Sequence, residues 1–369
     1  MSLRFNPNIL AVPRMRNMVS KEEVQAQYGV EKVYRMSYNE SPLGPSPKAI
    51  AAMQETAVSL GDYSDFSDDR LRHALAATFG RGLSADHFVC ATSGFEALEF
   101  VGRGFLQPGD EVIVSHPTFG VYNRLARMGG AKLVDVPLQP ETFAFDVDGI
   151  LAAVTENTRL VIVCNPNNPT GNLLTAAEMD RLVNELPDHV LLVADEVYFH
   201  FVASPDFPDS LQYVLEGRNV VIIHTFSKGY GLAGLRLGYA IAPPEIADYL
   251  GRLQRGFHLN GVAIAGGLAA LADQEHLQKN VALVQAQKQW LYGQYDRLDL
   301  RYWPSETNFM LVELPVAAGE VCQKLLSYGV MVRPAGIEPM PNVLRVTVST
   351  PDGNETFING LEEILRQRG

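Results

Sequence analysis

A lysine that stands between small hydroxyl residues and an arginine is the sequence feature with the clearest chemical potential. Thr225, Ser227 and Lys228 directly follow the β-branched run 219–223, and Arg236 comes eight positions after the lysine. The run predicts a buried strand, so the lysine is expected just beyond its carboxyl end, where open α/β sheets bind ligands. An amine placed there can bond a carbonyl while its neighbours hold a phosphate, and pyridoxal 5'-phosphate carries both groups.

The same stretch has a competing interpretation as a nicotinamide site, because Gly229, Gly231 and Gly234 match the pattern G-x-G-x-x-G. That pattern needs a helix directly after the glycines, so that the helix N-terminus faces the pyrophosphate. Here residues 235–242 predict another strand, and the stretch lies late in the chain. The nicotinamide interpretation is therefore disfavoured.

Composition excludes several other functions. The 369 residues suffice for a large domain with a smaller one, and the net charge of −12 disfavours a nucleic-acid surface. Cys90, Cys164 and Cys322 form neither a disulfide framework nor a metal-binding pattern, which favours a reducing cytoplasm and no metal. The longest apolar run, 261–272, is too short to cross a membrane, and no signal peptide follows Met1.

Short apolar runs alternate with amphipathic segments over most of the chain, after an N-terminal arm, 1–38, that is expected to be extended. This alternation predicts an α/β fold of three layers, αβα, with a mainly parallel sheet. Strands are expected at 87–91, 111–115, 132–137, 160–164, 190–194, 219–223 and 235–242, and helices at 47–61, 68–79, 95–105 and 175–186.

The pattern changes after residue 244. Residues 261–298 are expected to be helical over most of their length, and strands at 308–314 and 343–348 with helices at 318–328 and 355–367 predict a smaller α+β unit. The predicted division is an arm 1–38, a large cofactor-binding domain 39–258 and a small C-terminal domain 259–369, with a ligand cleft between the two domains.

Taken in order, the polar segments resemble those of the fold-type I pyridoxal-phosphate aminotransferases of class I and II, and most closely the histidinol-phosphate aminotransferase branch. The resemblance covers nearly the whole chain from Tyr38 onward. Its motifs are YNESPLGPSP, HPTFGVY, NPNNPTG, ADEVY, TFSK with AGLR, NFMLV, VMVRP and LRVTV.

The resemblance implies a role for each polar strand end. Lys228 would bond the cofactor's carbonyl carbon and later move a proton, and Asp195 would pair with the pyridine nitrogen and keep it protonated. Asn168 and Tyr198 would hydrogen-bond the phenolic oxygen, and Phe119 would stack on the ring. Without the resemblance, Asp195 could instead cap a turn and Phe119 could belong to the core.

The cofactor's phosphate is implied to lie among hydroxyls, a guanidinium and the backbone N–H groups of a helix start. These groups come from Ser93, Gly94, Phe95, Thr225, Ser227 and Arg236. Tyr63 matches a tyrosine that family members contribute to the same phosphate across a homodimer interface. The resemblance therefore implies a homodimer.

For the substrate, Arg345 aligns with the arginine that binds a carboxylate, because a guanidinium grips a carboxylate or phosphate with two parallel hydrogen bonds. Arg333 and Asn39 are expected in the same pocket, although Arg333 could instead form a salt bridge on the surface. The implied reaction is a ping-pong transfer between an amino donor, best L-histidinol phosphate, and 2-oxoglutarate or glutamate. This would be a step of histidine biosynthesis.

Two departures from the family pattern keep other substrates open. Residues 12–16 lack the usual Pro-Tyr pair, and Phe95 replaces an acid before Glu96. An aromatic or other amino-acid aminotransferase, a decarboxylase of the phosphothreonine type and a non-enzymatic sensor are the alternatives.

Overall fold

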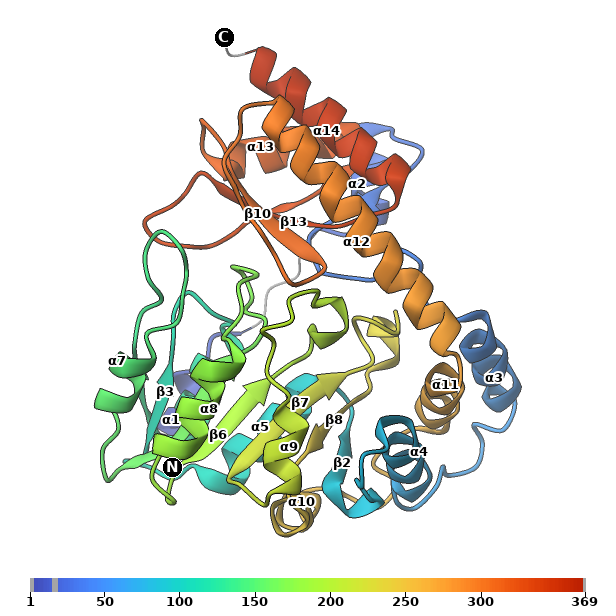
Figure 1. Ribbon diagram of the computed structural model, residues 1–369. Coiled ribbons are helices and arrows are strands. Elements are labelled where there is room, and N and C mark those ends of the chain that lie inside the picture. Colours follow the sequence, from blue (N-terminus) through green and yellow to red (C-terminus); the bar gives the residue numbers. More distant parts are fainter. Residues whose placement is uncertain (1–2, 15–18, 368–369) are drawn as a thin grey trace.

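The computed structural model describes residues 3–14 and 19–367 (Figure 1). Its large lobe is built on a seven-stranded sheet of order β2-β8-β7-β6-β5-β3-β4, counted within the described residues. β8 is antiparallel to both of its neighbours and every other pair is parallel, which confirms the predicted mainly parallel sheet. The strands are β2 (Phe88–Ala91), β3 (Glu111–Val114), β4 (Lys132–Asp135), β5 (Thr158–Cys164), β6 (Leu191–Asp195), β7 (Val220–Thr225) and β8 (Gly238–Ile241).

Helices cover both faces of this sheet, because its strands send alternate apolar side chains to opposite sides. Val161 and Leu192 lie in the core with the helices on one face, whereas Leu160 and Val193 lie in the core on the other. α4 (Asp69–Phe79), α7 (Val147–Ala152), α8 (Ala176–Glu185), α9 (Ser210–Leu215) and α11 (Gly261–Leu271) contribute to the first core. α5 (Gly94–Phe105), α6 (Val121–Gly129) and α10 (Pro244–Gly251) contribute to the second.

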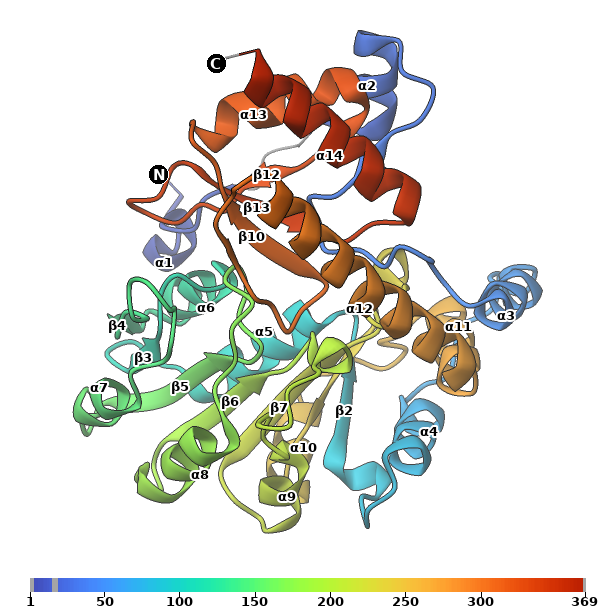
Figure 2. The same ribbon diagram turned by 45° about the horizontal axis from the view of Figure 1, so that its top comes forward.

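The smaller lobe lies beyond the carboxyl ends of the sheet strands (Figures 1 and 2). Its four-stranded sheet has the order β12-β13-β10-β9, with antiparallel pairing throughout. The elements are α12 (Gln274–Arg297), β9 (Tyr302–Trp303), β10 (Phe309–Glu313), α13 (Ala318–Leu325), β11 (Val330–Met331), β12 (Arg333–Pro334), β13 (Val343–Thr347) and α14 (Pro351–Arg366).

The long helical region splits into two helices that serve different lobes. α11 packs on α3 (Pro47–Ala57) and α4, and its Ala263 and Ile264 are buried in the core of the large lobe. α12 begins at Gln274 and runs up into the small lobe (Figure 1). Asn280 of α12 donates to the carbonyl of Gly229 at 2.9 Å, so this helix is also fixed to the residue after Lys228. The division at residue 259 stays a prediction.

The prediction of an extended N-terminal arm is wrong for its described part. The arm contains the helices α1 (Pro7–Leu10) and α2 (Lys21–Tyr28). Ser20 and Glu23 form a capping box at the start of α2, and this Ser-x-x-Glu signal is present in the sequence. Within the described residues, β1 (Tyr34–Arg35) is the strand of this arm, and it pairs with β11 of the small lobe.

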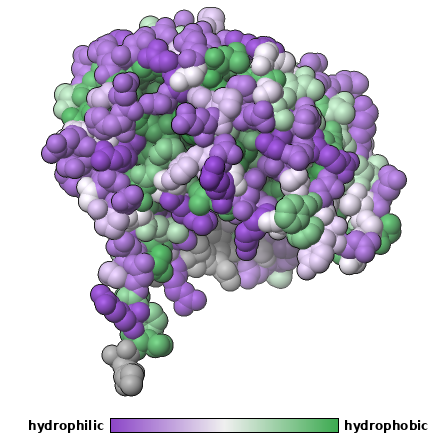
Figure 3. Space-filling view, turned by 90° about the horizontal axis from the view of Figure 1, so that it is seen from below, coloured by the Kyte–Doolittle hydropathy of each residue, from purple (hydrophilic) through white to green (hydrophobic). Residues whose placement is uncertain are grey.

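The face opposite the small lobe, seen from below, carries mainly hydrophilic residues with hydrophobic ones scattered among them (Figure 3). Within residues 3–14 and 19–367, no helix is both long enough and apolar enough to span a membrane.

Candidate active site

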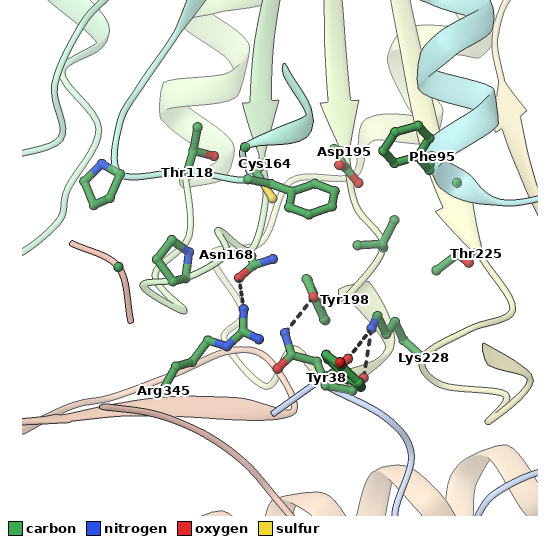
Figure 4. Close-up of a pocket in the computed structure, with 18 of the residues that line it drawn as sticks. Tyr38, Phe95, Thr118, Cys164, Asn168, Asp195, Tyr198, Thr225, Lys228 and Arg345 are labelled. Atoms are coloured by element: carbon green, nitrogen blue, oxygen red, sulfur yellow. Dashed lines mark hydrogen bonds between the residues drawn. The ribbon is translucent and has the colours of Figure 1, made fainter. Parts of the chain in front are cut away.

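A cavity of about 860 Å³ lies where the carboxyl ends of the sheet strands meet the small lobe (Figure 4). It brings together almost every residue that the sequence marks for chemistry. Those lining it are Asn39, Ser93, Gly94, Phe95, Phe119, Asn168, Asp195, Tyr198, Thr225, Ser227, Lys228, Arg236, Arg333 and Arg345. Asp195 ends β6 and Lys228 follows β7, and the two residues share this cavity.

Lys228 extends from the turn after β7 toward the loop that contains Tyr38 and Asn39. Its Nζ donates to the carbonyl oxygens of Tyr38 at 3.1 Å and Asn39 at 3.0 Å. Burial lowers the pKa of Lys228 to about 7, and the nearby Arg345 adds to this effect. A large share of this amine is therefore neutral near pH 7, and the neutral form is the one that acts as a nucleophile or a proton acceptor.

Asp195 is the last residue of β6 and is 1% exposed. Its Oδ2 accepts a hydrogen bond of 2.7 Å from the hydroxyl of Tyr122, whereas its Oδ1 is buried without a partner in the described residues. Burial raises the pKa of Asp195 to about 6, although the hydrogen bond from Tyr122 lowers it. A buried acceptor left without a donor is costly, so Oδ1 is suited to a ligand N–H.

A chain of polar side chains connects the large lobe to the small one beside Lys228. The hydroxyl of Tyr198 accepts from Asn39 Nδ2 at 2.9 Å, and Asn39 Oδ1 accepts from the hydroxyl of Thr347 on β13 at 3.0 Å. Burial raises the pKa of Tyr198, so its hydroxyl stays protonated and can donate to a ligand. Asn39 has a φ of 56°, in the left-handed region that asparagine tolerates better than most residues.

Arg345 comes from β13 and is 8% exposed. Its guanidinium donates to Asn168 Oδ1 and to the Ser37 carbonyl, both at 2.7 Å, while its Nε has no partner among the described residues. Burial lowers its pKa to about 10, so it remains a cation at neutral pH. Arg333 pairs with Arg345 across the strands β12 and β13 and is exposed at the cavity rim. Two guanidinium groups therefore line the small-lobe side of the cavity.

The predicted phosphate site lies at the first turn of α5. Ser93 caps this helix through its Oγ, which accepts from the Glu96 N–H at 3.1 Å, and the first N–H groups of a helix lack intrahelical acceptors. Thr225 Oγ1 donates to Ser227 Oγ at 3.0 Å beside this turn. Arg236 has a φ of 57°, in the left-handed region. Its side chain is exposed and supplies a positive charge on this side of the cavity.

Of the two aromatic residues predicted to contact the cofactor, Phe119 lines the cavity and Tyr63 does not. Phe119 lines the cavity, is 39% exposed, and makes an edge contact with Tyr122 at 6.0 Å between ring centroids. Tyr63 does not reach the cavity of its own chain. It is 83% exposed, stacks on Phe257 at 4.6 Å, and lines a second hollow with Arg255 and His258.

Several site residues were missed by the sequence analysis. Tyr122 binds Asp195, yet only its position at the end of the quoted motif HPTFGVY could have indicated it. Cys164, His116 and Tyr38 also line the cavity. His116 and Tyr38 begin the quoted motifs HPTFGVY and YNESPLGPSP, but neither was assigned a role. The residues 12–16 that lack the family's Pro-Tyr pair fall partly outside the described residues.

The glycine pattern 229–234 does not form a dinucleotide-binding turn. A short 3₁₀ helix, Ala233–Leu235, and then β8 follow it, in place of an α-helix. A Cβ on Gly231, which has a φ of 69°, would lie 2.2 Å from the Gly44 carbonyl oxygen, so this glycine serves close backbone packing.

Comparisons with known proteins agree with this geometry. The family model described as aminotransferase class I and II matches residues 31–361. The chain therefore belongs to the aminotransferase class I and II family, and the predicted class of enzyme, a transaminase, is confirmed.

Two relatives and one solved structure are histidinol-phosphate aminotransferases. Histidinol-phosphate aminotransferase from Moorella thermoacetica is 41% identical over 93% of this chain and 88% of its own, and that from Symbiobacterium thermophilum is 39% identical over 96% and 98%. The solved histidinol-phosphate aminotransferase from Sinorhizobium meliloti, in complex with pyridoxal-5'-phosphate, has a TM-score of 0.89 at 28% identity and covers 99% of this chain and 98% of its own.

Proposed function

We propose that this protein is a pyridoxal 5'-phosphate-dependent aminotransferase that moves an amino group between L-histidinol phosphate and 2-oxoglutarate or glutamate. The observation that carries the proposal is the free, buried Oδ1 of Asp195 in the same cavity as the Nζ of Lys228. The names of the relatives at 41% and 39% identity support the choice of amino donor. Histidine biosynthesis is the corresponding pathway.

The residues present fit this cofactor at each of its polar groups. Asp195 Oδ1 would accept the N–H of the ring nitrogen, and the Tyr198 hydroxyl with Asn168 would hold the phenolic oxygen. The phosphate would lie at the start of α5, beside Thr225 and Arg236. When bound, the cofactor supplies an electron-withdrawing ring that stabilises negative charge at the substrate's α-carbon.

The chain's own groups account for the proton movements and for orientation. A carboxylate at Asp195 keeps the partner N–H charged, which is an electrostatic contribution of the kind that dominates enzyme catalysis. Lys228 Nζ, with its pKa lowered to about 7, would accept the proton from the substrate's α-carbon and donate it to the cofactor's carbonyl carbon. Phe119 would cover one face of the ring.

Substrate binding is assigned to the small lobe. Arg345 and Arg333 would bind the phosphate of the donor and the carboxylate of the acceptor in turn, since both anions suit two parallel N–H donors. For Arg345, such an anion would also satisfy the free Nε. The side chain of Asn39 would contribute to the same wall.

A homodimer and a cytoplasmic location belong to the proposal. The exposed aromatic residues Tyr63, Phe66 and Phe257, at 83%, 70% and 42% exposure, support a partner surface on which Tyr63 reaches the phosphate of the other subunit. The three cysteines are free and buried, as is usual in a reducing compartment.

The proposal is tested by a transamination screen with 2-oxoglutarate as acceptor. Histidinol phosphate, phenylalanine, tyrosine, aspartate and leucine are the donors, and carbon dioxide release is followed in parallel. We expect histidinol phosphate to have the highest kcat/KM, and borohydride reduction to fix the cofactor on Lys228. A preference for an aromatic donor, or release of carbon dioxide without need for 2-oxoglutarate, would contradict the assignment.

A further inference from the structure

His258 is a partly buried histidine that does not line the active-site cavity but contacts Glu96, next to the predicted phosphate site. Its Nε2 lies 2.8 Å from Oε2 of Glu96, and its side chain is 6% exposed. Its ring packs against Phe100 at 5.6 Å, and its Nδ1 has no partner among the described residues. A carboxylate acceptor requires the proton on Nε2.

Glu96 in turn holds the turn from Thr92 to Phe95. The same Oε2 accepts from the Thr92 N–H at 2.6 Å and from the Thr92 hydroxyl at 2.8 Å. Burial raises the pKa of Glu96, but the hydrogen bonds from Thr92 and His258 more than offset this and hold it below its usual range. Three donors therefore converge on one carboxylate oxygen at the base of the phosphate site.

The segment 254–258 also fixes the strand that leads into this turn. Gln254 Nε2 donates to the Cys90 carbonyl at 2.6 Å and to Asp68 at 2.8 Å. Phe257, next to His258, carries the stacked ring of Tyr63. The segment 254–258 thus contacts the residues before and after the Thr92–Phe95 turn, and it also contacts Tyr63.

We propose that His258 is a positioning residue whose hydrogen bond to Glu96 keeps the Thr92–Phe95 turn in the shape that binds the cofactor's phosphate. This inference rests on the proposed function, because it assigns the phosphate of pyridoxal 5'-phosphate to that turn. It does not make His258 a catalytic residue, since the imidazole reaches the phosphate site only through Glu96 and Thr92.

Two substitutions separate the hydrogen bond from the packing of the ring. His258→Phe keeps a ring against Phe100 but removes the N–H, whereas His258→Gln loses the ring but keeps a donor near the position of Nε2. The full-length proteins, freed of cofactor, are titrated with pyridoxal 5'-phosphate and with pyridoxal, which lacks the phosphate. Binding is read from absorbance, and thermal unfolding is recorded for each variant.

We expect His258→Phe to weaken the binding of pyridoxal 5'-phosphate about tenfold and that of pyridoxal less than twofold, with His258→Gln within about threefold of wild type for both. Unchanged affinity in His258→Phe, equal losses for the two ligands, or equal losses in the two variants would overturn the proposal. If His258→Phe does not fold, Thr92→Val, which removes another donor to the same oxygen, must show the phosphate-specific loss relative to Thr92→Ser.

The proposed function fails in a different way. If the proposed function is wrong, wild type would bind pyridoxal 5'-phosphate no better than Lys228→Ala does. The residue at position 258 would then make no difference. A wild type that prefers pyridoxal 5'-phosphate to pyridoxal, with the same preference in His258→Phe, would leave the function standing and remove only the role of His258.

Discussion

The hydroxyl of Tyr122 and the carboxylate of Asp195 are 2.7 Å apart, and this hydrogen bond occupies only Oδ2. Tyr122 stands on the first turn of α6 and Asp195 at the end of β6, so the contact joins a helix to the sheet. The Tyr122 hydroxyl thereby fixes the orientation of the carboxylate and leaves Oδ1 available to a ligand.

Replacement of Tyr122 by Phe is expected to raise the pKa of Asp195 above its present value of about 6, because the hydroxyl is a donor that lowers it. Activity should fall about tenfold near pH 6 and less at pH 8, where the carboxylate is ionised in both proteins. The pH dependence of kcat/KM measures this. An acid limb at the same pH in both proteins would show that the hydroxyl does not tune Asp195.

The rate at which cofactor-free protein captures pyridoxal 5'-phosphate should increase as the pH rises through about 7. Burial lowers the pKa of Lys228 from 10.5 to about 7, and only the neutral amine attacks a carbonyl. Stopped-flow absorbance between pH 5.5 and pH 9 follows the reaction, with Lys228→Ala as the blank. A rate that still rises tenfold per pH unit at pH 9 would mean that the amine is not desolvated.

Glu196 is expected to make the folded state less stable as the pH rises. Burial raises its pKa from 4.5 to about 8, although the hydrogen bond from Ser210 lowers it, so the folded protein keeps a proton that the unfolded chain releases. The loss should accumulate between about pH 5 and pH 8 and reach on the order of 4 kcal/mol.

Glu196→Gln should remove this dependence and be more stable than wild type at pH 8, with similar stability at pH 5. Chemical denaturation at the two pH values measures it, and Glu216→Gln on the surface is the matched control. Parallel curves for wild type and Glu196→Gln would mean that the carboxyl is ionised in the fold.

Mixing two inactive variants should restore activity if Tyr63 serves the partner's site. In a hybrid of Tyr63→Ala and Lys228→Ala, one site carries both defects and the other carries none. An equal mixture refolded together would regain roughly a quarter of wild-type activity, since half of the dimers are hybrids with one native site. Activity no higher than that of Tyr63→Ala alone would place the tyrosine outside the site.

The sequence predicts the sheet and most of the site because both depend on local patterns. Apolar runs of β-branched residues marked the strands, and the polar residues after them, such as Asp195 and Lys228, had to meet at one edge of a parallel sheet. The start of α2 is not predicted, although Ser20 and Glu23 match the Ser-x-x-Glu capping signal, because the polar residues of the arm show little apolar periodicity to indicate a helix after it.

Other contacts could not be inferred from local patterns. The link between His258 and Glu96 joins residues 162 positions apart, and neither lies in a segment whose periodicity fixes their approach. Arg345 likewise contacts Asn168 and Ser37 only because of the way in which the two lobes pack. Such contacts depend on tertiary packing, which the local patterns of one sequence do not reveal.

The 24 residues of α12 make a rigid rod of about 36 Å that starts beside α11 and ends in the small lobe. A tilt of roughly 5° at its lower end would displace the far end by about 3 Å over that length. Because Asn280 near the fulcrum is bonded to the carbonyl of Gly229, the same tilt pulls on the backbone next to Lys228. A movement of the small lobe that tilts α12 would therefore be transmitted, as by a lever, to the backbone beside Lys228.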